Sequence, residues 1–218
     1  MSEEQNIDMQ ELARHLRCPE GETGITVAEM MNLTNRNMIT KTIHTLSFKG
    51  EDMVLEIGPG NGEHVTDVVA MSDNMGYHGI DISQTMVQQA RSNNTATPFA
   101  SFLRYNGKEI PFADAEFDMA FTVNTIYFWD APEAYCKELA RVLKPEAQFS
   151  IGFIPKRIME QLPFTQYGFT LYNENDVEAL MGGAGFSLQE TINEKEKVPG
   201  LSGNETEREF SILKLIKK

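Results

Sequence analysis

One carboxylate and three evenly spaced glycines form the stretch of this chain that is best suited to ligand chemistry. In VLEIGPGNG, residues 54–62, Glu56 stands inside an apolar run that leads into Gly58, Gly60 and Gly62. Glycine lets a ligand approach the main chain closely, and the first N–H groups of a following helix attract an anion. We therefore expect a ligand-binding loop here, although glycines also occur in turns that bind nothing.

The spacing of these glycines argues against one common dinucleotide fingerprint. G-x-G-x-x-G starting at Gly58 would require glycine at position 63, where the chain has Glu63. The observed order is E-x-G-x-G-x-G, and Asp81 follows at the end of the next apolar run. A nicotinamide-dependent reductase is therefore the weaker alternative.

Short apolar runs alternate with amphipathic ones from Met53 onward, which predicts a parallel sheet covered by helices on both faces. The predicted strands are 53–57, 77–82, 99–103, 117–123 and 147–154, and the predicted helices between them are 62–71, 83–94 and 130–143. Ser83 is the expected N-cap of the second of these helices.

The two ends of the chain differ from this pattern. A helix at 176–186 is followed by strands at 186–193 and 209–216 with only a polar loop, 194–208, between them. Two strands without an intervening helix are expected to pair antiparallel. Residues 1–50 are expected to add helices at about 7–17 and 36–48, as an accessory segment ahead of a domain at 51–218.

Composition restricts the partners and the compartment. The net charge is −13, and the only basic cluster is the tail LKLIKK, so a nucleic-acid partner is not expected. No apolar run is long enough for a membrane span, and MSEEQNIDMQ is unlike a secretory signal. Cys18 and Cys136 suggest no disulfide framework, which favours the cytoplasm.

The four histidines are dispersed along the sequence and suggest no metal site. They are His15, His44, His64 and His78. Each is interpreted as a surface or helix-packing histidine, because no set of ligands with metal spacing can be assembled from them.

Four stretches resemble, in order and spacing, the motifs of class I S-adenosylmethionine-dependent methyltransferases, in particular the small-molecule type related to ubiquinone and menaquinone biosynthesis. VLEIGPGNG resembles the first motif, GIDIS the acidic second, IPFADAEFDMAF the third and ELARVLKPEAQFSIG the helix-strand signature after it. The match covers roughly residues 50–154. It implies a Rossmann-like α/β fold with five parallel strands and a C-terminal antiparallel hairpin. It also implies S-adenosyl-L-methionine as cofactor and S-adenosyl-L-homocysteine as product.

The resemblance also implies which residues bind the cofactor. They are Glu56, Gly58, Gly60, Asn61, Gly62, Asp81, Ile82, Asn106, Gly107 and Asn124. A carboxylate at the tip of the second strand can accept hydrogen bonds from both hydroxyls of a ribose, which suits Asp81. Glu56 has two open roles, as an organiser of the loop through backbone contacts or as a direct ligand contact.

Two positions depart from the family pattern. Asn106 stands where the family usually has an acidic residue that receives a hydrogen bond from the adenine amino group. Its side-chain oxygen can still accept that bond, but an asparagine in YNGK is also typical of a turn. Glu146 and Ala147 replace common glycines, which affects a turn more than the chemistry.

A sulfonium methyl is already activated, so a methyltransferase mainly holds the acceptor in line and excludes water. No residue is identified as a general base, and Tyr127 is only a weak candidate for a catalytic role. The stretch NTIYFWD is expected to line the acceptor pocket, with Phe128 alternatively packing the next helix. MMNLTN and residues 155–172, rich in methionine and aromatics, are expected to cover a site for a small, apolar or aromatic acceptor. A non-catalytic cofactor-binding or regulatory protein on the same fold is the alternative.

Overall fold

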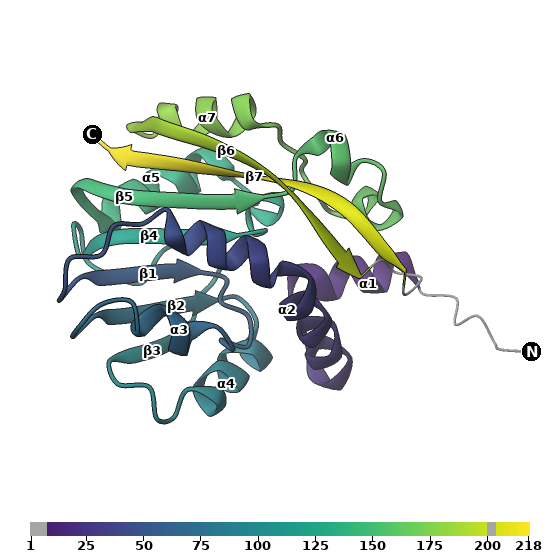
Figure 1. The fold of residues 1–218 in the computed structure, drawn as a ribbon, viewed down its shortest axis with the longest axis horizontal. Coiled ribbons are helices and arrows are strands. Elements are labelled where there is room, and N and C mark those ends of the chain that lie inside the picture. Colours follow the sequence, from purple (N-terminus) through teal and green to yellow (C-terminus); the bar gives the residue numbers. More distant parts are fainter. Residues whose placement is uncertain (1–7, 200–203) are drawn as a thin grey trace, which may run out of the picture.

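A single sheet is the centre of the computed structural model, which describes residues 8–199 and 204–218 (Figure 1). In these residues seven strands lie in the order β3-β2-β1-β4-β5-β7-β6. Their bounds are β1 Met53–Ile57, β2 Gly76–Asp81, β3 Ala100–Arg104, β4 Phe117–Val123, β5 Leu143–Phe153, β6 Phe186–Pro199 and β7 Glu205–Lys217. Strands β1 to β5 pair in parallel, and β7 runs antiparallel to both β5 and β6. The expected five parallel strands and terminal hairpin are confirmed.

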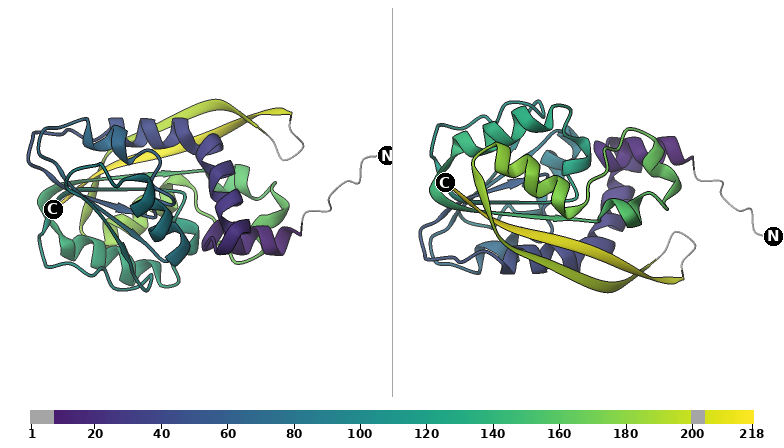
Figure 2. Two further views of the ribbon diagram at one scale, coloured as in Figure 1. Left: turned by 90° about the horizontal axis from the view of Figure 1, so that it is seen from below. Right: turned by 90° about the horizontal axis from the view of Figure 1, so that it is seen from above.

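Helices cover both faces of this sheet, as the edge-on views in Figure 2 show. The α-helices are α1 Met9–Arg17, α2 Gly21–His44, α3 Val65–Val69, α4 Gln84–Asn93, α5 Pro132–Val142, α6 Lys156–Met159 and α7 Glu174–Gly183, and two short 3₁₀ turns are η1 Ile126–Phe128 and η2 Pro163–Gln166. One apolar cluster joins the sheet to α3, α4 and the end of α2, and another joins it to α5 and α7. No helix in the described ranges is long and apolar enough to cross a membrane.

The strands at the centre of the sheet are covered on both faces, so their side chains on both faces must be apolar. Val54, Leu55 and Ile57 of β1 are all buried, and so is most of β4. A strand that is covered on both sides reads as a continuous apolar run, which is why the sequence predicts these two strands with their observed bounds. The predicted N-cap is also observed, because Ser83 Oγ accepts the Met86 N–H at 3.1 Å. The expected framework is therefore set by local pattern.

The N-terminal segment is more helical than the sequence predicts. Helix α2 begins at Gly21, whereas a helix was expected only from about residue 36. Its first half contains glycine and β-branched residues, which weaken the local helical signal. Contacts with a distant segment replace that signal, since Asn32 donates a hydrogen bond to Glu63 at 2.7 Å. The start of the predicted first helix, Ile7, lies outside the described residues.

The C-terminal hairpin is longer than predicted. Residues 194–199 and 205–208 were expected to be loop, but β6 and β7 continue through them, and only 200–203 are not described. Charged residues face each other across these strands, as in the pair Glu196 and Arg208. Cross-strand pairs of opposite charge stabilise a two-stranded ribbon without an apolar pattern. Figure 1 shows this ribbon extending past the end of β5 toward α1 and α2.

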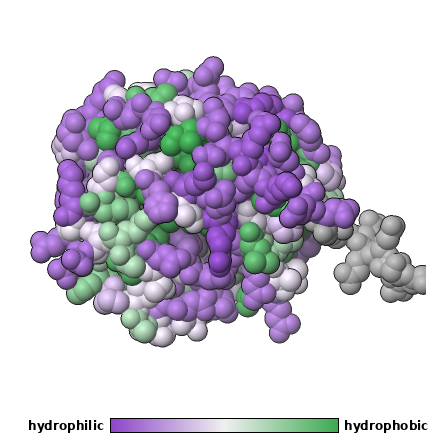
Figure 3. Space-filling view, viewed as in Figure 1, coloured by the Kyte–Doolittle hydropathy of each residue, from purple (hydrophilic) through white to green (hydrophobic). Residues whose placement is uncertain are grey.

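The surface in the orientation of Figure 3 is mainly hydrophilic, and apolar residues gather there only in small separate groups. This agrees with the excess of 32 acidic over 19 basic residues in the chain. A strongly charged surface keeps a small domain soluble and disfavours non-specific association.

The packing of α2 on β5 can be tested at Gly152. A Cβ at this position would clash with the Thr42 hydroxyl oxygen of α2. We expect Gly152→Ala to lower the free energy of unfolding by about 1–3 kcal/mol, the usual cost of overpacking. Urea denaturation followed by circular dichroism measures the change.

Gly182 in α7 provides the matched control. A Cβ there would meet no atom within 4 Å. Gly182→Ala should raise the free energy of unfolding by about 0.5–1 kcal/mol, because alanine loses less conformational entropy in a helix. Equal effects of the two substitutions would contradict the close contact between α2 and β5.

Candidate functional site at the carboxyl edge of the sheet

The loops that follow β1, β2 and β4 meet at one edge of the sheet. The chain leaves β1 toward α3 on one face and leaves β4 toward α5 on the other face. In open α/β sheets such a reversal opens a crevice at the carboxyl ends of the strands, and ligands bind there. The residues predicted from the first two motifs lie at this point.

The three glycines of the first loop have different roles. A Cβ on Gly58 would lie 2.5 Å from Cγ2 of Thr125, and one on Gly62 would lie 3.1 Å from Cβ of Ala90. Those two glycines let neighbouring segments pack closely. Gly60 has a φ of +58°, and a Cβ there would meet no atom within 4 Å. Among the three, Gly60 therefore presents bare backbone to open space.

Asp81 links this loop to the tip of β2. Its carboxylate is 7% exposed and accepts the Gly60 N–H at 3.2 Å and the Ser83 N–H at 2.8 Å. Burial raises the pKa of Asp81 to about 6, against the lowering effect of these N–H donors. Beside it, Cγ2 of half-buried Ile82 lies 3.2 Å from where a Cβ on Gly107 would stand. Asp81, Ile82, Gly60 and Gly107 are thus brought to one edge.

Glu56 is held by two side chains. Its carboxylate is 2% exposed, each of its oxygens lies 2.9 Å from Nε2 of His64, and the Tyr77 hydroxyl donates to Oε2. Of the two roles expected for Glu56, this geometry supports the loop organiser. It acts through the His64 side chain, however, and not through backbone N–H groups of the loop as expected.

His64 is the residue that the sequence reasoning missed. It was interpreted as a packing histidine, yet it binds the buried carboxylate of β1 from the position just before α3. A signal was present, because a carboxylate in a strand buried on both faces requires a partner. The sequence did not show which residue would supply it, since Glu56 and His64 are separated by a loop of irregular shape.

Helix α2 touches the glycine loop directly. Asn32 donates to Oδ1 of Asn61 at 2.9 Å and to Glu63 at 2.7 Å, and Arg36 forms an ion pair with Glu63 at 3.0 Å. Asn93 of α4 donates to the Asn61 carbonyl oxygen at 3.0 Å. Asn61 is therefore fixed between α2 and α4, and the MMNLTN segment reaches the site.

The turn between α1 and α2 lies on the same edge. The Ser83 hydroxyl donates to the carbonyl oxygen of Pro19, and the Gly21 N–H donates to Thr85 at 3.3 Å. Burial, followed by the charge of Asp81, raises the pKa of the Cys18 thiol. Residues 18–21 thus lie across the end of β2, next to Asp81.

Asn106 has the turn role that was left open for it. Its side chain is exposed, and Oδ1 accepts the N–H groups of Lys108 at 2.8 Å and Glu109 at 2.9 Å. A hollow of about 440 Å³ lies beside it, lined in part by Tyr105 and Glu138. The oxygen expected to meet an adenine amino group is already bonded to its own loop.

Tyr127 forms an internal link. Its hydroxyl is within 3.1 Å of Oδ1 of Asn124 and 3.0 Å of the Ile154 carbonyl oxygen, and it accepts the Ile154 N–H at 2.6 Å. The side chain is 3% exposed, and burial raises its pKa. The geometry gives this hydroxyl the task of holding Asn124, with a φ of +58°, and leaves it poorly placed to act as a base.

The neighbouring aromatics are mostly packed. Phe128 contacts Phe169 with ring centroids 4.6 Å apart, and Trp129 contacts Tyr135 at 4.7 Å. The Trp129 contact is with the next helix, α5, whereas the Phe128 contact is with the segment of residues 155–172. The indole Nε1 of Trp129 is buried and has no hydrogen-bond partner among the described residues. An unpaired buried donor of this kind is suited to a ligand acceptor.

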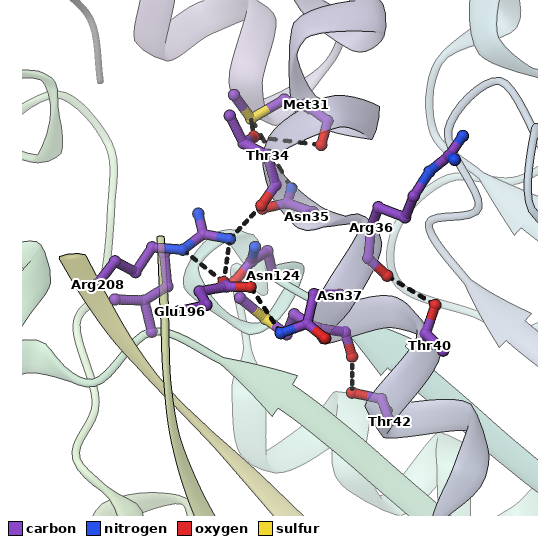
Figure 4. Close-up of polar contacts among 12 residues, drawn as sticks. Met31, Thr34, Asn35, Arg36, Asn37, Thr40, Thr42, Asn124, Glu196 and Arg208 are labelled. Carbon is purple, nitrogen blue, oxygen red and sulfur yellow. Dashed lines mark hydrogen bonds and ion pairs between the residues drawn. The ribbon is translucent and has the colours of Figure 1, made fainter. Parts of the chain in front are cut away.

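A polar cluster from α2 and the hairpin closes the other side of the edge (Figure 4). Arg208 binds Glu196 at 2.7 Å and the Thr34 carbonyl oxygen, and Glu196 accepts a hydrogen bond from Asn37 at 2.9 Å. The pair is largely buried, with side chains 13% and 6% exposed. Oδ1 of Asn35 is buried without a partner in the described part of the chain.

This cluster is near the Tyr127 link. The charge of Arg208 lowers the pKa of Tyr127, against the larger raising effect of burial. Tyr127 in turn contacts Asn124. Helix α2, the hairpin and the tip of β4 therefore converge on one region. No group of three or more His, Cys, Asp or Glu residues in the described ranges could hold a metal ion.

Comparisons with known proteins agree with this geometry. Residues 55–151 match the family model of a methyltransferase domain. The O-methyltransferase rstn1 of Aspergillus nomiae is 30% identical over 138 residues, which are 62% of this chain and 58% of that relative. The chain spans about half the length of the curated relatives that head this comparison, between 47% and 58%.

Solved structures show the same fold. The YcgJ protein of Bacillus subtilis superposes with a TM-score of 0.69 at 16% identity, covering 84% of this chain and 99% of that one. A SAM-dependent methyltransferase of Aquifex aeolicus superposes with a TM-score of 0.66 at 20% identity, covering 98% of this chain and 100% of that one. Together with the matched domain model and the sheet order 3-2-1-4-5-7-6, these findings agree with the family expected from the four motifs. Residues 55–151 of this chain match a methyltransferase domain, within the fold that the solved structures share.

Proposed function

We propose that this protein transfers a methyl group from S-adenosylmethionine to a small-molecule acceptor. The observation that carries the proposal is the pairing of bare backbone at Gly60 with the buried carboxylate of Asp81, at the reversal point of a methyltransferase sheet. We call this site, formed by Gly60 and Asp81, the cofactor seat. It suits an adenosyl compound whose ribose donates hydrogen bonds and whose amino-acid end approaches the main chain.

The residues present fit this cofactor in most positions. Asp81 would accept hydrogen bonds from the ribose hydroxyls, and the backbone around Gly60 and Asn61 would face the amino-acid end. Gly58 and Gly62 would shape that loop, and Asn124 would approach the methionine part. Glu56 would have no direct contact with the cofactor and would act indirectly, through its bond to His64.

The adenine side is the weaker part of this fit. Asn106 uses its oxygen within its own turn, so the adenine would rely on the Gly107 N–H and on packing against Ile82. The unpaired Nε1 of Trp129 would supply a further donor at this edge.

Residues 1–50 would act as a cover over the seat, attached to the domain at 51–218. Their described part supports this role, because α2 binds Asn61 through Asn32 and the turn before it binds Ser83 through Pro19. Met38 and Ile43 anchor the second half of α2 in the core. Entry of the cofactor would therefore require only α1 and the start of α2 to move.

The acceptor would enter between the cover, the tip of β4 and the hairpin. Phe128 and Phe169 would supply an apolar wall, and the unpaired Oδ1 of Asn35 would supply a polar atom. This mixture suits an aromatic or apolar acceptor that carries one hydrogen-bonding group. Three curated relatives are named O-methyltransferases, which supports a hydroxyl oxygen as the acceptor atom.

When bound, S-adenosylmethionine supplies a methyl group already activated on a sulfonium. The chain would contribute alignment of the acceptor oxygen and exclusion of water by α2 and the hairpin. The hydroxyl proton would leave to solvent, since none of the described residues around Tyr127 offers a free base.

Transfer of tritiated methyl to a panel of hydroxylated aromatic compounds tests the reaction. Failure to bind the cofactor at all would support a non-catalytic protein instead.

Gly60 provides the direct test of the seat. Gly60→Val should abolish binding of S-adenosylhomocysteine in calorimetry, because the side chain would project into the open space that the cofactor needs. Gly185→Val is the matched control, since Gly185 also has a positive φ and no atom within 4 Å of its Cβ position, but lies at the turn between α7 and β6. Equal binding by both variants would contradict the loop assignment.

Asp81 should give cofactor affinity a defined pH dependence. With a pKa of about 6, the Asp81 carboxyl keeps its proton at pH values where an ordinary aspartate is ionised. Its ionisation lowers the stability of the protein without ligand, and hydrogen bonds from ribose hydroxyls would offset that cost. Affinity for S-adenosylhomocysteine should therefore rise as pH increases through 6. Asp81→Ala should weaken binding by about 1–3 kcal/mol and remove that rise. Calorimetry at pH 5, 6 and 7 decides, and unchanged affinity in the variant would place the ribose elsewhere.

A further inference from the structure

A buried triad of side chains underlies the glycine loop. Glu56 comes from β1, Tyr77 from β2 and His64 from the residue just before α3. Both carboxylate oxygens of Glu56 lie 2.9 Å from Nε2 of His64, and the Tyr77 hydroxyl donates to Oε2. The proposed methyl transfer assigns none of these three side chains a direct contact with the cofactor.

His64 is surrounded mainly by acids. Glu56 faces it from β1, Glu63 from the loop and Asp67 from α3. Burial alone would lower the pKa of His64, but the charge and hydrogen bond of Glu56, with smaller effects of Asp67 and Glu63, raise it above the usual value. On the side of α2, Arg36 is paired with Glu63. The imidazole therefore holds its proton further into the neutral range than an ordinary histidine does.

The bond from His64 to Glu56 joins the end of the glycine loop to the strand that precedes the loop. At the start of the loop, the Gly58 N–H donates to the Ile80 carbonyl oxygen at 2.8 Å. At its end, His64 ties the first residue before α3 back to the strand from which the loop departs. The two ties fix both ends of the backbone that carries Gly60.

We propose that His64 is a positioning residue for cofactor binding, which acts through Glu56 to hold the Gly58–Gly62 loop with Gly60 facing the seat. The proposal rests on the proposed function, because it concerns the same site. In its protonated form His64 donates a charge-assisted bond to a carboxylate that is almost fully buried, and such bonds are roughly twice as strong as neutral ones. Loss of the proton weakens the tie and loosens the loop.

Tyr77 separates positioning from simple stabilisation. It binds the same carboxylate as His64, but from β2, and it has no bond to the loop. Tyr77→Phe removes one hydrogen bond to Glu56 and leaves the tie between β1 and α3 in place. A role of the triad in stability alone would make the Tyr77 and His64 variants behave alike toward the cofactor.

The experiment measures S-adenosylhomocysteine affinity by calorimetry from pH 6.5 to 9 in the full chain. Wild type should bind less tightly as pH rises through the raised pKa of His64. His64→Ala should bind about tenfold more weakly at pH 7, the effect of losing one charge-assisted bond. His64→Gln keeps an amide donor near the Nε2 position, so it should recover most of the affinity and lack the alkaline loss. Tyr77→Phe should keep the wild-type pH profile.

Each result is decisive for one proposal. If wild type binds no S-adenosylhomocysteine at any pH, the proposed function fails. If wild type binds and both His64 variants show its affinity and alkaline loss, the positioning role is overturned while the function stands.

A second variant covers the case in which His64→Ala does not fold. The double variant Glu56→Gln with His64→Gln replaces the ion pair by two neutral amides that can bond to each other. It should bind without the alkaline loss, and a wild-type profile in this variant would also overturn the role of His64.

Discussion

A carboxylate buried in the central strand is the constraint on which the site depends. Glu56 is 2% exposed in a strand that has covered faces on both sides, so leaving it unpaired would cost several kcal/mol. Its partners come from the adjacent strand and from the end of the following loop. Satisfying one buried charge therefore fixes the register of β1 against β2 and, at the same time, the path of the loop that faces the ligand. The core and the site share this one interaction.

Elements outside the matched domain complete the site. Residues 55–151 supply the sheet centre, the glycine loop and Asp81, whereas α2 and the β6–β7 hairpin lie outside that range. Those two elements bind each other through Arg208, Glu196 and Asn37, and α2 binds the loop through Asn32. In the proposed function, the matched domain would hold the cofactor, and the segments around it would determine the acceptor. The fold alone does not determine the substrate.

Local pattern explains which parts the sequence predicts correctly. The bounds of β1 and β4 follow from continuous apolar runs, and Ser83 is predicted from its place before an amphipathic run. The predictions for the first half of α2 and for the outer part of the hairpin were wrong, because contacts between distant segments stabilise both. Asn32 of α2 bonds to Glu63, and charge pairs such as Glu196 with Arg208 join the two strands. At the site, spacing indicates Gly60 and Asp81. It cannot indicate that His64 is the partner of Glu56, which depends on the three-dimensional path of the loop.

The charge of Glu56 acts on two other ionisable groups at this edge, His64 and Asp81. The charge of Glu56 raises the pKa of Asp81, in addition to the larger effect of burial. An imidazolium at His64 offsets the charge of Glu56, so it also reduces the repulsion that Asp81 experiences when it ionises. In the proposed fit, His64 would thus favour the ionised form of Asp81, which is the form that accepts hydrogen bonds from a ribose. A histidine with no direct ligand contact in the proposed fit can therefore influence both the shape of the loop and the charge of the carboxylate beside it.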